Sequence, residues 1–183
     1  MKLLVVFGTL EGQTEKIAHY LSNIFQNRGY TVETQHGAKI SDDFEIEEFD
    51  AVVVGVSIHM SKYPAYINKF ANKYHQRLNT IPSAFFTVCM AIDSKRTVTH
   101  EEAKRYGEKF LAETGWRPKY IDTFAGAVKY TQYNFITRFI MKIIARREGG
   151  STDTSRDHEY TDWEAVARFA DRFMQELITT EYS

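Results

Sequence analysis

Five short apolar runs alternate with helical patterns along this chain, and no other feature of the sequence limits its fold as strongly. A continuous apolar run of about four to eight residues is typical of a strand that is covered on both faces of a sheet. Strands separated by helices imply right-handed crossovers, and therefore a parallel sheet with helices on both faces. The expected strands are residues 3–7, 30–34, 51–57, 83–90 and 119–128, and the expected helices are residues 14–28, 63–78, 99–113 and 161–179.

Local signals place several helix ends. Gly29 follows the last apolar position of the first helix, where a glycine commonly ends a helix. Pro64 suits the first turn of the second helix. Thr161 is the expected N-cap of the last helix, and Glu164 three residues later completes a capping box. The acidic stretch at residues 42–50 is expected to be a surface connection with one short helix.

The length of 183 residues, with 43% hydrophobic and 26% charged residues, predicts a single domain over residues 1–183 that buries its own core. Cys89 is the only cysteine, which excludes an intramolecular disulfide and a multi-cysteine metal site. A reducing, cytoplasmic setting is therefore expected. The apolar start at residues 3–7 is too short for a signal peptide, and no stretch approaches the ~20 apolar residues of a spanning helix.

Charge is unevenly distributed along the chain. The formal net charge of −1 gives no indication of nucleic-acid binding. Residues 1–50 hold nine acidic and four basic residues, whereas residues 129–147 hold five basic residues and no acidic one. A basic block inside a near-neutral chain indicates one face that contacts an anionic surface or ligand.

The first expected strand runs directly into a short loop, within residues 7–14 (FGTLEGQT), that leads to the first helix. Unpaired N–H groups at a helix start, together with the helix dipole, favour an anion there. Thr9 and Thr14 add hydroxyl donors, and Gly12 lets the backbone approach phosphate oxygens. The loop lacks the lysine of a Walker loop and the three glycines of a dinucleotide fingerprint, so a single monophosphate fits better. The residues alone also allow Thr9 and Gly12 to be turn residues and Thr14 a helix cap.

Two further loops are expected to reach the same pocket, because ligands of open α/β sheets bind outside the carboxyl ends of the strands. The candidate residues are Ser57, Ile58 and His59 after the third strand, and Val88, Cys89, Met90 and Ala91 after the fourth. His59 is equally consistent with a solvent-exposed loop residue. Cys89 fits a small buried apolar residue better than a nucleophile. Tyr63 lies just beyond the first of these loops.

The first loop resembles the flavodoxin phosphate loop, a hydroxyl-rich T/S-x-x-G-x-T segment after the first strand. The resemblance implies that this phosphate loop, residues 9–14, holds FMN through Thr9, Leu10, Glu11, Gly12, Gln13 and Thr14. Later segments are similar to one branch of that superfamily, the bacterial flavodoxin-type protoporphyrinogen oxidases. They include residues 116–118 (WRP), 125–127 (AGA), 149–154 (GGSTDT) and 160–164 (YTDWE). The similarity runs almost end to end, and the later segments are more specific than the loop.

The resemblance implies a flavodoxin-like, doubly wound α/β fold with strand order 2-1-3-4-5 and a helical insertion at residues 129–160. It also implies a repeated two-electron oxidation of protoporphyrinogen IX to protoporphyrin IX, with electrons passed through FMN to menaquinone or ubiquinone. The protein is then expected on the cytoplasmic face of the inner membrane. An FMN electron carrier for protein partners and a flavin-free binding module are the alternatives. The near-neutral charge counts against the carrier, because typical flavodoxins are strongly acidic.

Residues 133–147 of the insertion are expected to form an amphipathic helix. Its apolar positions are Phe135, Ile136, Phe139, Ile140, Ile143 and Ile144, and its basic positions are Arg138, Lys142 and Arg146. This pattern is typical of a helix in the membrane interface, although core packing, a homo-oligomer interface and a substrate lid are also consistent with it. Because protoporphyrinogen carries two propionates, Lys129, Arg138, Lys95 and Arg96 are candidates to pair with them.

Overall fold

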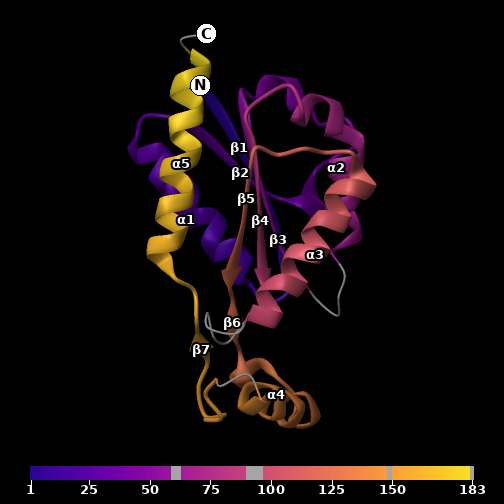
Figure 1. Cartoon of the computed structure of the whole chain (residues 1–183), viewed down its shortest axis with the longest axis vertical. Helices are drawn as coiled ribbons and strands as arrows, with labels where there is room; N and C mark the ends of the chain where they lie inside the picture. Colours follow the sequence, from indigo (N-terminus) through magenta and orange to yellow (C-terminus); the bar gives the residue numbers. More distant parts are fainter. Residues whose placement is uncertain (59–62, 90–96, 148–149, 182–183) are drawn as a thin grey trace.

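The computed structural model of the chain describes residues 1–58, 63–89, 97–147 and 150–181. Within them, five strands form one parallel sheet in the order β2-β1-β3-β4-β5 (Figure 1), which confirms the expected topology. The strands are β1 (Lys2–Gly8), β2 (Thr31–His36), β3 (Ala51–Ser57), β4 (Ser83–Cys89) and β5 (Tyr120–Ala125).

Helices cover both faces of this sheet (Figure 1). α1 (Gln13–Asn27) and α5 (Trp163–Glu181) pack on one face, and α2 (Ala65–Leu78) and α3 (Thr97–Thr114) pack on the other. Two short 3-10 helices, η1 (Gly37–Lys39) and η2 (Ile46–Glu48), lie in the connection between β2 and β3. η2 is the short helix expected in the acidic stretch.

The sheet divides the core into two apolar layers. Alternate side chains of a strand point to opposite faces. Leu3 and Val5 of β1 therefore join the layer under α1 and α5, while Leu4 and Val6 join the layer under α2 and α3. All four of these side chains are fully buried. Because both faces are covered, a central strand is apolar at successive positions, which explains the continuous apolar runs in the sequence.

The layer under α1 and α5 leaves no room for a side chain at Gly55 in β3. A Cβ added to Gly55 would lie 1.9 Å from Cζ of Phe86 on the neighbouring strand β4. Phe86 is fully buried, and its ring packs against the rings of Phe124 and Phe169 at centroid distances of 5.6 and 6.0 Å. The neighbouring rings of Phe124 and Phe169 therefore limit how far the Phe86 ring can move away from a larger residue at position 55.

The end of α1 is as expected, and the start of α2 differs by one position. Gly29 has φ +89°, and its N–H donates to the carbonyl oxygen of Gln26 at 2.9 Å. This left-handed conformation is the one that favours glycine after a helix. Pro64 is the N-cap of α2 rather than a first-turn residue, with extended ψ of 135°.

The capping box expected at the start of α5 is wrong. The helix begins at Trp163, so Asp162 occupies the N-cap position, and its carboxylate accepts a hydrogen bond from the N–H of Ala165 at 3.0 Å. An aspartate caps a helix as well as a threonine does. The Thr161 hydroxyl is used elsewhere, because it donates to the carbonyl oxygen of Ala125 at 2.8 Å.

The strand expected over residues 119–128 is interrupted at Gly126. β5 ends at Ala125, and β6 (Ala127–Val128) leaves the main sheet to pair antiparallel with β7 (His158–Glu159). The Gly126 N–H donates to the carbonyl oxygen of Cys89 at 2.7 Å, and the Gly126 carbonyl accepts from the N–H of Tyr160 at 3.0 Å. Gly126 therefore joins the edge of the main sheet to the insertion.

The insertion extends beyond the carboxyl ends of the strands (Figure 1). Its described elements are η3 (Tyr130–Gln132), α4 (Phe135–Arg147) and β7, and β6 leads into it. It has a small core of its own, which contains Val128, Tyr130, Met141 and Ala145, each at most 8% exposed. Among the described residues, the helices include none that is both long enough and apolar enough to cross a membrane.

We expect Gly55→Ala to lower the free energy of unfolding by about 1–3 kcal/mol, because the new methyl group overpacks the layer around Phe86. Gly107→Ala in α3 is the matched control, since its Cβ would make ordinary contacts at 3.7 Å from Phe85 Cε1 and 3.8 Å from Tyr63 Oη. Alanine is favoured over glycine in a helix by about 0.5–1 kcal/mol, so this variant should be neutral or more stable. Urea denaturation measures both. Equal stabilities would contradict the tight packing at Gly55.

Candidate functional site

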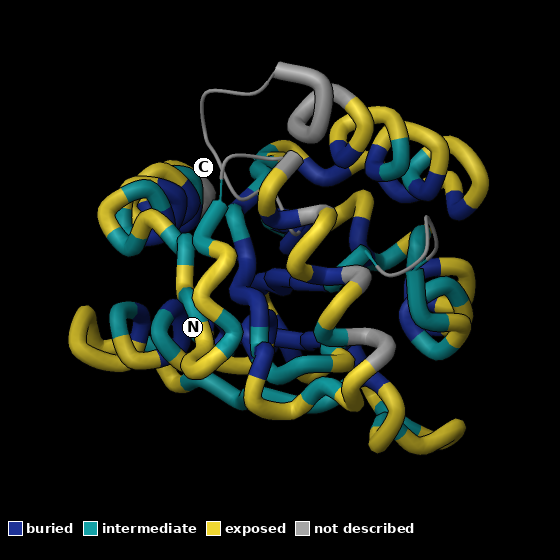
Figure 2. Tube along the Cα trace, turned by 90° about the horizontal axis from the view of Figure 1, so that it is seen from below, coloured by how far each residue is buried: buried dark blue, intermediate teal, exposed yellow. Residues whose placement is uncertain are grey.

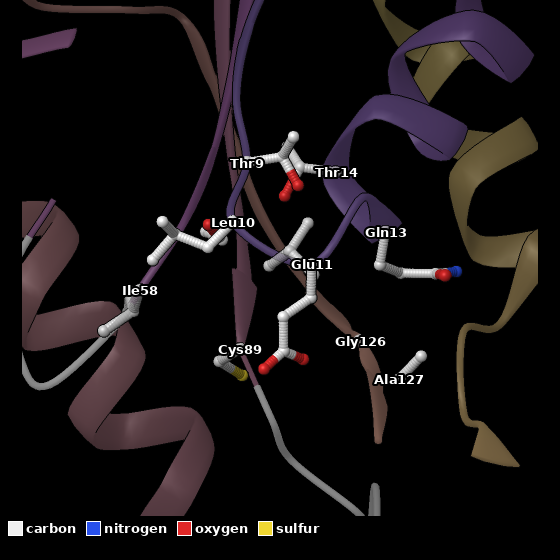
Figure 3. A pocket seen from close by; sticks show the side chains of 11 residues that line it. Thr9, Leu10, Glu11, Gln13, Thr14, Ile58, Cys89, Gly126 and Ala127 are labelled. Carbon is white, nitrogen blue, oxygen red and sulfur yellow. The ribbon is translucent and has the colours of Figure 1, made fainter. Parts of the chain in front are cut away.

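A pocket of about 410 Å³, including its open mouth, lies at the carboxyl ends of the strands (Figure 3). The lining residues are Thr9, Leu10, Glu11, Gln13, Thr14, Ser57, Ile58, Val88, Cys89, Gly126 and Ala127. Four segments that are far apart in the sequence thus meet at one edge of the sheet, as expected for parallel strands.

The phosphate loop turns sharply into α1 at Gly12. Gly12 is the N-cap of the helix and has φ +84°, a left-handed conformation that glycine adopts without strain. Its N–H donates to the hydroxyl oxygen of Thr9 at 2.9 Å, and its carbonyl accepts the first helical hydrogen bond from Lys16 at 3.1 Å. The N–H groups of residues 13–15 have no carbonyl partner within the helix. The loop therefore presents several backbone donors at the positive end of a helix dipole.

Thr14 carries a buried hydroxyl that lacks a partner. Its side chain is 0% exposed, and its oxygen has no hydrogen-bond partner among the described residues. Leaving such a group unsatisfied costs about 1–3 kcal/mol, and buried polar groups are rarely left so. Figure 3 shows Thr9 and Thr14 among the side chains that line the pocket. The interpretation of Thr14 as a helix cap is wrong, because Gly12 holds that position.

The opposite wall of the pocket is formed by the ends of β3 and β4. The Ile58 N–H donates to the carbonyl oxygen of Val88 at 3.0 Å, which extends the pairing of the two strands to the pocket edge. The Ser57 hydroxyl donates to a backbone carbonyl at the end of β1 at 3.4 Å. Cys89 is 7% exposed and packs with Ile58, as expected for a small buried apolar residue. This apolar wall suits a flat heteroaromatic ring better than a sugar or a peptide.

The structure brings the expected cofactor-binding residues that it describes to this pocket, except Gly12, which shapes the loop without lining the cavity. His59, Met90 and Ala91 lie outside the described residues, as do the candidate propionate partners Lys95 and Arg96. Gly126 and Ala127 line the pocket and were missed from the sequence. A lone glycine inside an apolar run is the signal that could have found them, since it often marks a close backbone approach.

Tyr63 belongs to the core and not to the pocket. Its hydroxyl shares a hydrogen bond of 3.0 Å with the hydroxyl of Thr87, and its ring packs edge-on against Phe85 and Phe110. Burial raises the pKa of the Tyr63 phenol to about 12. Tyr63 therefore stays protonated and contributes to packing beneath α3.

The basic residues of the insertion lie in different environments. The Arg138 guanidinium donates to the carbonyl oxygens of Tyr130 at 3.0 Å and Tyr133 at 3.3 Å, so it ties α4 to η3. Lys142 and Arg146 are exposed on α4. Lys129 instead reaches the phosphate loop, since a Cβ added to Gly12 would lie 3.5 Å from its Nζ.

The insertion region is attached to the phosphate loop and the start of α1 by side-chain contacts. They are Tyr133 Oη to Glu11 Oε1 at 2.8 Å, Gln13 Nε2 to Thr161 Oγ1 at 2.9 Å, and Lys16 Nζ to Glu159 Oε2 at 2.5 Å. Burial, and then the neighbouring Glu11 carboxylate, raise the pKa of the Tyr133 phenol above its ordinary value. Tyr133 therefore remains a hydrogen-bond donor at neutral pH and holds the Glu11 carboxylate in place.

These groups fit a phosphate monoester joined to a flat ring. Hydroxyls and unpaired backbone N–H groups suit the phosphate, and such a ligand would give the buried Thr14 hydroxyl the partner that it lacks. The apolar wall at Ile58, Val88 and Cys89 suits the ring. A doubly wound sheet with this pocket at its switch point defines the class of FMN-binding α/β proteins.

Comparison with known proteins identifies the family. A family model described as a flavodoxin domain matches residues 4–155. The chain belongs to this flavodoxin-domain family, and FMN is its cofactor. Among relatives, protoporphyrinogen IX dehydrogenase (quinone) of Escherichia coli K12 is 38% identical over 172 residues, which cover 93% of each chain. The protein of the same name from Leishmania major is 31% identical over 179 residues, which cover 94% of this chain and 74% of that protein.

Solved structures show the same fold at low sequence identity. A flavodoxin from Streptococcus pneumonia TIGR4 has a TM-score of 0.54 and 14% identity, with 98% of this chain and 99% of that chain covered. A cysteine-to-serine mutant of a Pseudomonas aeruginosa flavodoxin has a TM-score of 0.51 and 15% identity, with 81% and 97% covered. These similarities extend to the architecture alone.

We expect Thr14→Val to separate binding from stability. The variant keeps the shape of the side chain but removes a hydroxyl that has no partner, so the flavin-free protein should be as stable or more stable by about 1 kcal/mol. FMN affinity should fall roughly tenfold or more, because a hydrogen bond to a charged group contributes about 1.5–3 kcal/mol. Urea denaturation and FMN fluorescence titration measure the two effects.

Thr114→Val is the matched control for this substitution. The Thr114 hydroxyl is also buried but donates to the carbonyl oxygen of Phe110 at 2.9 Å. Its loss should destabilise the protein and leave FMN affinity unchanged. If Thr14→Val destabilised the flavin-free protein as much and bound FMN normally, the phosphate site would be misplaced.

Proposed function

We propose that this protein is an FMN-dependent, quinone-linked protoporphyrinogen IX dehydrogenase of haem biosynthesis. The observation that carries the proposal is the 38% identity, over 93% of both chains, to the Escherichia coli protein named for that activity. The Leishmania major relative bears the same name at 31% identity. The FMN pocket described above supplies the cofactor site that such an oxidation needs.

Bound FMN supplies the redox chemistry, taking up two electrons with a hydride equivalent and returning the electrons to a quinone. The chain's own residues bind and orient the cofactor. The hydroxyls of Thr9 and Thr14 and the N–H groups of residues 13–15 would hold the phosphate. Ile58, Val88 and Cys89, which line the pocket, would pack against the ring.

Menaquinone and ubiquinone, the proposed electron acceptors, are both lipid-soluble, so a surface that meets a membrane is part of the proposal. α4 offers such a surface, because Phe135, Phe139 and Ile143 are 84%, 60% and 46% exposed. They recur at every fourth position and so share one side of the helix. Core packing, one of the alternatives for this helix, is therefore wrong for these three residues. Exposed apolar side chains gathered in this way mark interaction surfaces.

The position of α4 supports docking by this end of the molecule. Figure 1 places α4 beyond the carboxyl ends of the strands, the end at which the pocket opens. Figure 2 views the molecule from that end and shows exposed segments of the chain around a buried interior. A membrane that contacts α4 would thus lie at the pocket's end of the molecule.

The strength of such docking is modest. Fully burying a Phe or Ile side chain contributes about 1.5–3 kcal/mol, and each cation near an anionic leaflet adds about 1 kcal/mol. Lys142 and Arg146, exposed on the same helix, supply two such cations. These magnitudes favour reversible, peripheral association with the cytoplasmic face of the inner membrane over permanent insertion.

Turnover tests the enzymatic proposal. FMN-loaded protein is mixed anaerobically with protoporphyrinogen IX and with a menaquinone or ubiquinone analogue, and porphyrin fluorescence is followed. Catalytic porphyrin formation that depends on the quinone is the expected result. Fully flavin-loaded protein that forms no porphyrin would contradict the proposal and favour an FMN electron carrier for protein partners.

Vesicle binding tests the membrane surface. We expect the double variant Phe135→Ser, Phe139→Ser to lose most co-sedimentation with vesicles of phosphatidylglycerol and phosphatidylethanolamine while it keeps its FMN. Ile178→Ser on α5 is the control, because Ile178 is also exposed, at 50%, but lies outside the insertion. Unchanged vesicle binding by the double variant would exclude this surface. If sedimentation velocity then showed a loss of self-association, the helix would be a homo-oligomer interface.

A further inference from the structure

Lys129 lies where the insertion approaches the phosphate loop. It follows β6 directly, and its backbone is fixed on both sides. Its N–H donates to Tyr133 Oη at 3.4 Å, and its carbonyl accepts from the N–H of Gln132 at 3.0 Å. The side chain extends to the loop, where a Cβ on Gly12 would lie 3.5 Å from the Lys129 Nζ. That distance is an ordinary contact, so the ammonium group lies beside the start of α1.

The charge of Lys129 lacks a paired carboxylate within the described structure, where no acidic oxygen lies within 4.0 Å of its Nζ. Carboxylates of the loop and the insertion are bound by other groups. Glu11 accepts from the Tyr133 hydroxyl, Glu159 pairs with Lys16, and Asp157 accepts from both the N–H and the hydroxyl of Thr131. Beyond these hydrogen bonds from Thr131, the charge of Lys129 helps to lower the pKa of Asp157, but it forms no ion pair within 4.0 Å among the described residues.

The phosphate loop, in turn, offers an anion no net positive charge of its own. Its donors are hydroxyls and backbone N–H groups, and its one ionisable side chain is the Glu11 carboxylate. A phosphate monoester carries a charge of about −1.5 to −2 at neutral pH. Figure 3 shows the Glu11 carboxylate directed away from the hydroxyls of Thr9 and Thr14, and Tyr133 holds it there. The Glu11 carboxylate is therefore held away from the two hydroxyls, but the loop itself contains no cation.

We propose that the ammonium group of Lys129 binds the phosphate of FMN and supplies the positive charge that the loop lacks. The inference rests on FMN being the cofactor of this pocket. It gives Lys129 a different role from pairing with a substrate propionate. It also makes the insertion part of the cofactor site, because the residue that completes the phosphate site comes from the insertion and not from the flavodoxin-like core.

The test compares FMN with riboflavin, which has the same ring and ribityl chain but no phosphate. Dissociation constants for both are measured by flavin fluorescence for the wild type, Lys129→Gln and Lys129→Arg. Lys129→Gln should weaken FMN binding roughly tenfold and leave riboflavin binding unchanged, because only the charge-assisted contact is lost. Lys129→Arg should retain most of the FMN affinity. The FMN affinity of Lys129→Gln should also fall less steeply with added salt than that of the wild type.

Lys109→Gln is the charge-matched control. Lys109 lies on α3 in an exposed ion pair with Glu113 at 3.7 Å, and its loss should change neither dissociation constant. Thermal unfolding of the flavin-free proteins establishes that the variants are folded. An equal loss of FMN and riboflavin in Lys129→Gln, or no loss of either, would overturn the proposal. If the wild type itself bound FMN no more tightly than riboflavin, the phosphate site would be wrong as well. The wild-type comparison therefore distinguishes a failure of the phosphate site from a failure of the Lys129 contact.

Discussion

Parallel pairing of apolar strands is the constraint on which the rest of this molecule depends. Such strands cannot be joined by tight turns, so each connection crosses a face of the sheet and covers it, usually with a helix. The carboxyl ends of β1, β3, β4 and β5 consequently fall on one edge. The turn after β1 starts α1 at that edge, with its unpaired N–H groups facing outward. The pocket follows from this arrangement, because backbone from four strand ends converges on one small volume.

Two glycines determine how the pocket and the insertion meet. Gly12 takes the left-handed conformation that starts α1, with the Lys129 ammonium beside it. Gly126 sits so close to β4 that a Cβ would lie 3.2 Å from the carbonyl oxygen of Cys89. This close approach lets the chain leave the sheet after Ala125 and begin the insertion directly beside the pocket. The insertion therefore lies against the phosphate loop because the backbone at Gly126 directs it there.

The polar groups around the loop fall into two kinds. Tyr133, Glu11, Gln13 and Thr161 are hydrogen-bonded within the protein, and they attach the insertion to the loop. Thr14 is buried without a partner among the described residues, and the ammonium of Lys129 faces the loop without a carboxylate there. The buried Thr14 hydroxyl is a cost in the free protein. If a bound anion satisfies this hydroxyl and the Lys129 ammonium, as proposed, cofactor binding is thermodynamically linked to folding and to the position of the insertion.

The sequence alone was sufficient for the architecture and for the position of the phosphate loop. Burial determines the pattern of apolar residues along a strand or helix, and this pattern can be read from the local sequence. Examples are the apolar run at residues 51–57 and the apolar stripes of α1 and α5. The left-handed turn at Gly12 and the hydroxyls of Thr9 and Thr14 also lie within one short segment. The end of the last strand was predicted wrongly, because the chain changes its hydrogen-bond partners at Gly126. An apolar run in the sequence does not reveal such a change of partner.

Tertiary structure alone decided which distant residues meet at the site. The contacts of Tyr133 with Glu11 and of Thr161 with Gln13 span 122 and 148 residues, and no periodic pattern encodes them. The same is true of Lys129, whose charge was visible in the sequence but whose neighbour was not. The tertiary structure also decided that Phe135, Phe139 and Ile143 are exposed. The amphipathic pattern shows that a helix has an apolar side but not what covers that side. The sequence determines the chemistry of each side chain, whereas the packing of the helices and strands determines which side chains become neighbours.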